Sequence, residues 1–112
     1  MTPRENRIRL KKFDIASIRR KAAVLEGSIA VFDRLAIVLD SEIQLAENRS
    51  GIHDPAHFAY PTCAKATRTR RENLKRSTTE LQQQLADVNV QLEQAMDDLK
   101  LLEKGVKERA AR

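Results

Sequence analysis

Aromatic residues and cysteine are scarce in this sequence, and each scarcity argues against a class of structure. Only 4% of the residues are aromatic and tryptophan is absent, so a rounded core around a deep pocket is hard to build. The lone cysteine, Cys63, has no partner for a disulfide within the chain. The 112 residues include only three glycines and three prolines, so helix breakers are few. This composition favours long helices over a globular core.

Long apolar runs are also missing. The densest run, Leu35–Leu39, covers five residues, whereas a membrane-spanning helix needs roughly 20. The first residues, Met1–Asn6, lead into basic residues without the apolar stretch of a secretory signal. Together with the single cysteine, these features predict a cytoplasmic protein.

Two heptad runs dominate what is present. Both alternate spacings of three and four residues, which keeps an apolar seam on one side of a helix. The first run holds Ile8, Lys11, Ile15, Ile18, Ala22, Leu25, Ile29, Phe32, Ala36, Leu39, Ile43 and Ala46. The second holds Leu74, Thr78, Leu81, Leu85, Val88, Leu92, Ala95, Leu99, Leu102 and Val106, and extends back through Arg71, Thr67 and Ala64 to Tyr60. The predicted fold is therefore all-α, a long antiparallel two-helix coiled-coil hairpin.

The segment between the runs predicts a reversal with a short helix of its own. Gly51 is placed to end the first helix in a left-handed cap. Asp54 and Pro55 resemble an N-cap and a first helical residue, and Pro61 interrupts any helix that follows. We therefore expect a single domain over residues 1–112, with a first helix over about 6–49. A turn with a short helix follows at 50–61, and a second helix covers about 62–109.

A second apolar row runs along the first predicted helix, off the seam. Its members are Val24, Val31, Leu35, Val38 and Leu45, called the outer row below. At about 100° per residue, this row lies roughly 90–130° from the centre of the seam, so one partner helix cannot cover both. The row is either a set of scattered exposed aliphatic side chains or a docking face for another protein or a second copy.

Positive charge is concentrated in two places, although the net charge is only +5. Residues 1–27 hold eight Lys or Arg against three acids. The partner-binding candidates there form the basic free end: Arg4, Arg7, Arg9 and Lys12. Residues 65–76 hold the basic block: Lys65, Arg68, Arg70, Arg71, Lys75 and Arg76. On a helix, all of the block except Arg70 falls within an arc of about 140°, which suits a solvated face or an acidic protein partner. Nucleic acid is disfavoured, because no aromatic residues are interleaved with these cations and no known recognition motif is present.

Catalytic and metal-binding motifs find little support. His53 and His57 are four residues apart, but the expected N-cap lies between them and Cys63 lies beyond the next proline. Ordinary turn residues are the better interpretation, and no role is assigned to the three. No phosphate loop, activated nucleophile or sequestered carboxylate pair is evident. We expect no enzyme activity, no catalytic residue, no metal and no cofactor.

Two short segments resemble a known family. Arg9-Leu10-Lys11-Lys12-Phe13 is similar to the opening of alphaproteobacterial members of the FliJ family of flagellar export proteins. Ala56-His57-Phe58-Ala59-Tyr60-Pro61-Thr62 resembles the turn of the same group, with Gly51-Ile52 before it and Arg70-Arg71-Glu72-Asn73-Leu74 after it. Chain length and the two-helix layout agree with the family, so the likeness covers most of the chain.

The resemblance implies a soluble component of the flagellar type III export apparatus, with a role in flagellum assembly and hence in motility and chemotaxis. Family members form a long antiparallel coiled coil and associate with the hexameric export ATPase, the cytoplasmic domain of the export gate and substrate chaperones. The free end of the hairpin, around Arg4–Lys12 and Lys100–Arg109, would correspond to the part that enters the ATPase ring. Contact with the membrane would be indirect, through the gate. A homo-oligomeric four-helix scaffold, such as a homodimer, and a nucleic-acid-binding coiled coil stay open as alternatives.

Overall fold

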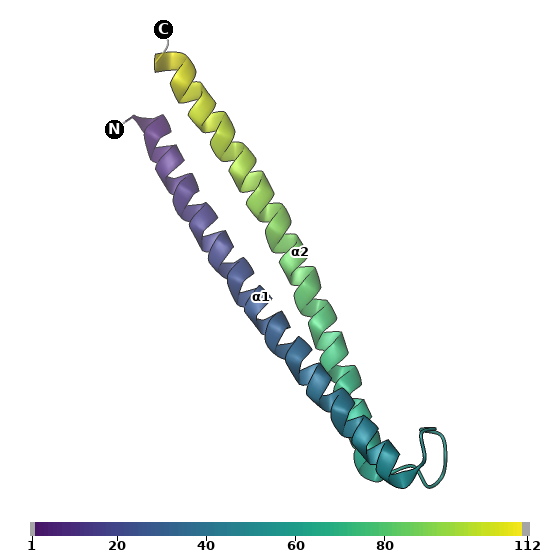
Figure 1. Cartoon of the computed structure of the whole chain (residues 1–112). Coiled ribbons are helices and arrows are strands. Elements are labelled where there is room, and N and C mark those ends of the chain that lie inside the picture. Colours follow the sequence, from purple (N-terminus) through teal and green to yellow (C-terminus); the bar gives the residue numbers. More distant parts are fainter. Residues whose placement is uncertain (1, 111–112) are drawn as a thin grey trace. The chain divides into compact units, whose positions relative to one another are not determined.

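The chain folds into two long helices that pack against each other as an antiparallel hairpin (Figure 1). The computed structural model describes residues 2–110, with helix α1 over Pro3–Ser50 and helix α2 over Thr62–Ala110. The predicted all-α hairpin is thus confirmed, and the helix boundaries lie within three residues of those expected. No helix among the described residues is both long and apolar enough to cross a membrane.

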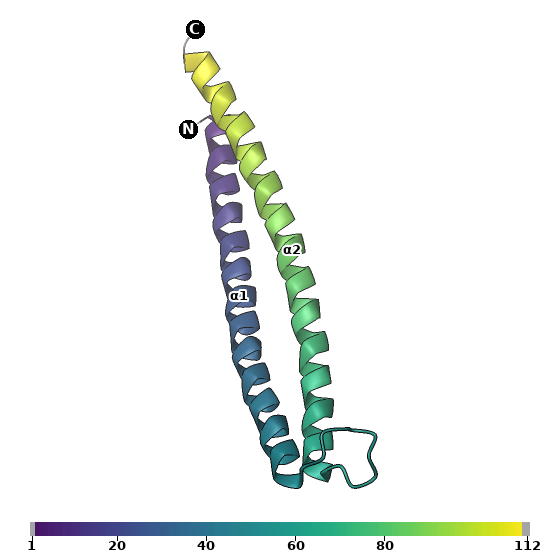
Figure 2. The same cartoon turned by 45° about the vertical axis from the view of Figure 1, so that its right-hand side comes forward.

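The packing divides into two compact units, each built from a piece of both helices. The open unit comprises Met1–Glu26 with Gln83–Arg112, and the turn unit comprises Gly27–Gln82. In the open unit the start of α1 lies beside the end of α2, and in the turn unit a loop over residues 51–61 joins the helices (Figures 1 and 2).

Helix α1 begins earlier than expected because two reciprocal hydrogen bonds cap its first turn. The Thr2 hydroxyl accepts a hydrogen bond from the Glu5 amide at 3.1 Å, and the Glu5 carboxylate accepts one from the Thr2 amide at 3.0 Å. This reciprocal pair is a capping box, and Pro3 between them suits the first helical position.

The other end of α1 follows the prediction. Gly51 adopts a φ of 73°, and its amide donates to the Glu47 carbonyl at 2.8 Å. This left-handed residue stops the helix where a side chain would be strained.

The short helix predicted near residues 55–60 is wrong. The loop instead contains successive turns, in which the His57 amide donates to the Asp54 carbonyl and the Tyr60 amide to the His57 carbonyl, both at 3.0 Å. The Asp54 carboxylate accepts from the Ala56 amide at 2.9 Å and so caps a turn rather than a helix. Pro61 leaves too few residues for a helix to form, because it excludes Tyr60 from helical geometry.

Every seam residue of α1 is buried or half-buried, as the heptads predict. In the open unit, Ile15, Ile18 and Ala95 form the core, and the side chains that close around it are Val88, Leu92, Met96 and Leu99. In the turn unit the buried apolar positions are Leu39, Ile43, Tyr60 and Ala64. Burial of these side chains supplies the main attraction between the helices of each unit.

Candidate protein-binding surfaces

The outer row lies outside the seam and is exposed. Its side chains keep between 43% and 69% of their accessible surface, and α2 covers none of them fully. Val31, Leu35, Val38 and Leu45 belong to the turn unit, while Val24 belongs to the open unit. With Ser28 and Glu42, the turn-unit members repeat at alternating spacings of three and four residues. This face of α1 has the geometry of a second, unpartnered seam.

Val24 borders an open groove within its own unit. The groove has a volume of about 600 Å³, and Leu25 and Val88 supply its apolar wall. Charged side chains stand at its margin: Arg20, Lys21 and Asp87. An aliphatic side chain of a partner helix would fit there, flanked by both signs of charge.

The basic free end is partly engaged with α2. The half-buried Arg4 places its guanidinium against Gly105, where an added Cβ would collide with it. Lys12 lies 3.9 Å from a carboxylate oxygen of Glu103. Arg7 and Arg9 are exposed, and the Arg9 guanidinium lies 6.0 Å from the centroid of the exposed Phe13 ring. Arg7 and Arg9 are therefore the members most available to a partner.

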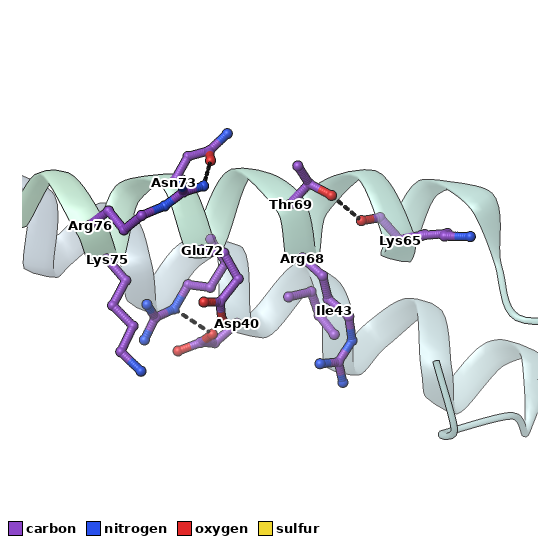
Figure 3. Close-up of a pocket in the computed structure, with 10 residues that line it drawn as sticks. Asp40, Ile43, Lys65, Arg68, Thr69, Glu72, Asn73, Lys75 and Arg76 are labelled. Carbon is purple, nitrogen blue, oxygen red and sulfur yellow. Dashed lines mark hydrogen bonds and ion pairs between the residues drawn. The ribbon is translucent and has the colours of Figure 1, made fainter. Parts of the chain in front are cut away.

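Five of the six cations of the basic block line one open groove in the turn unit, called the basic groove below (Figure 3). Arg70 is the exception, in agreement with the arc calculated from the sequence. The groove has a volume of about 540 Å³ and lies between α1 and α2, with the following lining: Asp40, Ile43, Lys65, Arg68, Thr69, Arg71, Glu72, Asn73, Lys75 and Arg76. Figure 3 shows Lys75 and Arg68 extending from α2 toward α1, where Asp40 and Ile43 lie.

Three of these cations are held by bonds within the unit. Arg71 donates through Nε to Asp40 Oδ1 at 2.9 Å. Arg76 donates to the side-chain oxygen of Asn73, one turn earlier. Arg68 bonds to the network described next, while Lys65 and Lys75 form no salt bridge with any described residue.

A polar network closes the turn unit beside this groove. The Tyr60 hydroxyl donates to Glu47 Oε2 at 2.7 Å, and Arg68 donates to the Tyr60 oxygen at 2.8 Å and to Glu47 Oε2 at 3.0 Å. The hydrogen bonds from Tyr60 and Arg68 hold the pKa of the Glu47 carboxyl below its ordinary value. Burial raises the pKa of the Tyr60 hydroxyl. Both directions favour the states that the network requires, an ionised Glu47 carboxylate and a protonated Tyr60 hydroxyl.

The turn loop presents an aromatic side chain to solvent. Phe58 is 96% exposed and stacks on His57 with ring centroids 4.8 Å apart. The Ala59 amide donates to His57 Nδ1 at 3.0 Å, so this nitrogen acts as an acceptor within the loop. His53 instead points toward Glu47, with Nδ1 3.6 Å from Oε1. The two histidines therefore have separate surroundings.

This geometry does not support a metal site. Among the described residues, no three His, Cys, Asp or Glu side chains gather in a group that could hold a metal ion. Cys63 is exposed at the start of α2.

The sequence interpretation missed the Glu47–Tyr60–Arg68 network and the Asp40–Arg71 pair. Tyr60 was recognised as a seam position, and its hydroxyl was the available signal, because a buried tyrosine oxygen needs a hydrogen-bonding partner. Glu47 and Asp40 both flank the seam, where acids commonly pair with cations of the facing helix.

Fold and surfaces together define a coiled-coil-like helical hairpin with uncovered apolar and basic faces. Comparisons with protein-family models, curated proteins and solved structures found no match to this chain.

Proposed function

We propose that this chain is a non-enzymatic, cytoplasmic component of a flagellar type III export apparatus, of the FliJ kind. In this role it binds the export ATPase, the cytoplasmic domain of the export gate and substrate chaperones, and it is peripheral to the inner membrane through the gate. The flagellar assignment rests on the resemblance of the turn and of the N-terminal segment. The observation that carries a protein-binding role is the outer row, which the hairpin leaves uncovered.

The outer row suits a helix or a groove of a partner protein. From Val31 to Leu45 it extends about 21 Å along α1, at about 1.5 Å per residue. Each side chain is roughly half-exposed, and covering the remainder contributes about 1 kcal/mol per residue. A partner that covered four such positions would gain enough to offset part of the cost of association.

The basic free end suits an acidic surface such as the lumen of an ATPase ring. Arg7 and Arg9 are exposed on α1. Because exposed cations act mainly through long-range attraction, they would speed association and make it salt-dependent.

Binding of the purified chain to the hexameric export ATPase of the same organism tests this proposal. We expect Arg7→Glu/Arg9→Glu to abolish binding at low salt and Val31→Glu/Val38→Glu to preserve it. That result would place the ATPase at the free end and leave the outer row for the gate or a chaperone.

Matched controls keep the charge change of each variant, and the control for the outer row also keeps its spacing of seven residues. Arg34→Glu/Arg49→Glu reverses two exposed cations of α1 elsewhere, and Ala30→Glu/Ile37→Glu alters two exposed positions beside the outer row. An unmodified chain that fails to bind the ATPase at low salt would overturn the export assignment.

A homodimer is the second candidate, because the outer row would also accept α1 of another copy in a four-helix arrangement. Light scattering over a range of concentrations separates the two. A molar mass that rises with concentration to twice that of the monomer favours the dimer, provided that Val38→Glu keeps the monomer mass. A monomer mass that stays constant with concentration excludes the dimer.

A further inference from the structure

The basic groove of the turn unit carries an excess of positive charge. Its lining includes five Lys or Arg side chains against two acids, Asp40 and Glu72. The Glu47 carboxylate adds a third negative charge near Arg68 but belongs to the closed network with Tyr60. The groove thus keeps a positive potential after its internal pairs are formed.

This surface combines two cations that carboxylates anchor with three that have no carboxylate partner among the described residues. Arg68 and Arg71 are anchored by Glu47 and Asp40, so their remaining N–H donors point in set directions. Lys65, Lys75 and Arg76 have no carboxylate partner among the described residues. Anchored guanidinium groups lose little side-chain entropy on binding a ligand. The two lysines supply positive charge that no neighbouring carboxylate neutralises.

The spacing of the cations matches a helix. Lys65 and Arg76 are separated by about 16 Å along α2, or about three turns at 1.5 Å per residue. A third helix laid between α1 and α2 would meet these cations with carboxylates spaced three or four residues apart.

The two acids of the lining disfavour a uniform polyanion. Asp40 and Glu72 would face phosphates along any nucleic acid placed in the groove, and no aromatic side chain lines it for stacking on bases. A polypeptide can place a neutral or basic residue opposite each acid, which a phosphate backbone cannot.

We infer that the basic groove binds an acidic α-helical segment, about three turns long, of a partner protein. This role does not depend on the partner being an export protein, and it uses residues separate from the outer row and the basic free end. Lys65 and Lys75 supply the principal contacts, and Arg68 and Arg71 hold the wall of the groove.

The test uses the full chain and a stapled 14-residue helical peptide with glutamates along one face, labelled for fluorescence anisotropy at about 0.05 M salt. We expect saturable binding to the unmodified chain that is lost when the glutamates are replaced by glutamine. Lys65→Glu/Lys75→Glu should weaken binding at least about tenfold, and Lys65→Gln/Lys75→Gln by a smaller factor.

The matched control is Lys100→Glu/Lys104→Glu, which makes the same charge change at two exposed positions of α2 in the open unit. We expect it to weaken binding less than about twofold. Equal losses in the two reversal variants, or equal binding of the glutamine peptide, would overturn the proposal. So would tighter binding of a duplex DNA with matched charge, lost in the same Lys65→Glu/Lys75→Glu variant. Circular dichroism checks that each variant keeps its helices.

Discussion

The open unit and the turn unit hold the same two helices together by different means. The core of the open unit is apolar, around Ile15, Ile18 and Ala95, and each of its ion pairs has one partner that is more than half exposed. The turn unit buries Glu47 and Thr67 as well, and Glu47 forms part of a closed network with Tyr60 and Arg68. Apolar burial supplies attraction in both units. The turn unit adds hydrogen bonds of 2.7 to 3.0 Å around a buried carboxylate, whereas the polar contacts between the helices of the open unit are longer, at 3.6 to 3.9 Å.

The two kinds of contact have different roles: apolar burial attracts the helices to each other, and the polar network fixes the alignment of one helix along the other. A heptad seam packs almost as well after a shift of seven residues, because apolar side chains have no required partner. Glu47 and Arg68 satisfy each other in one alignment only, and a shifted pairing would leave a buried charge unpaired. We therefore attribute the register of the hairpin to the turn unit and most of the helix–helix attraction in the open unit to its apolar core.

The largest expected effect comes from the core of the open unit. Ile15→Ala should destabilise that unit by about 3 kcal/mol, because it leaves a cavity beside Ala95 and Leu92. Hydrogen exchange measured by mass spectrometry should show faster exchange in the open unit, with less change in residues 27–82.

Ile37→Ala is the control for this change, since Ile37 is 66% exposed and packs in neither core. It should alter stability by less than about 0.5 kcal/mol. Similar effects of the two substitutions would contradict the division into a buried seam and an exposed outer face.

The network of the turn unit should show the next largest effect, and it should depend on pH. Glu47→Gln removes the charge that Arg68 and Tyr60 bond, so the melting temperature should fall by about 5 °C near neutral pH. Because the pKa of Glu47 is held below its ordinary 4.5, its contribution to stability is present above that pH. The contribution is lost as the pH falls through the lowered value.

Thermal melts monitored by circular dichroism over pH test both statements. The difference between the unmodified chain and Glu47→Gln should be largest near neutral pH and should narrow as the pH falls below 4.5. Glu42→Gln, an exposed acid on the same helix, is the control. A difference that stayed constant with pH would argue against the network.

Two glycines of the turn unit should respond in opposite directions, with the smallest effects. A Cβ at Gly27 would have no neighbour within 4 Å, so Gly27→Ala should stabilise α1 by about 0.5–1 kcal/mol. Gly51 has a φ of 73°, so Gly51→Ala should cost about 1 kcal/mol. Chemical denaturation measures both changes in the free energy of unfolding. Changes of the same sign would contradict a left-handed Gly51 at the end of α1.

The heptads were sufficient to predict the two helices and the positions that face each other. Every seam residue from Ile8 to Ala46 is buried or half-buried because the period of the pattern alone sets which face meets the partner helix. The turn could be located from Gly51 and Pro61 for a similar reason, since both act through local backbone geometry.

Features that depend on distant residues could not be predicted in the same way. Glu47 and Arg68 are 21 residues apart, and they meet only once the loop has reversed the chain. The loop itself was misassigned because Asp54 and Pro55 are equally suited to start a turn. The exposure of Phe58 likewise follows from the path of the loop rather than from any period.

The central claim, that the outer row is covered by a protein partner, is tested most directly by cysteine labelling. In a Cys63→Ser background, Val38→Cys on the outer row and Gln44→Cys beside it are both placed at exposed positions of α1. Their rates of reaction with a maleimide are compared with and without the cytoplasmic domain of the export gate and a substrate chaperone. We predict that one of these partners slows labelling of Val38→Cys several-fold and leaves Gln44→Cys unchanged. Equal rates at Val38→Cys with and without both partners would contradict the claim.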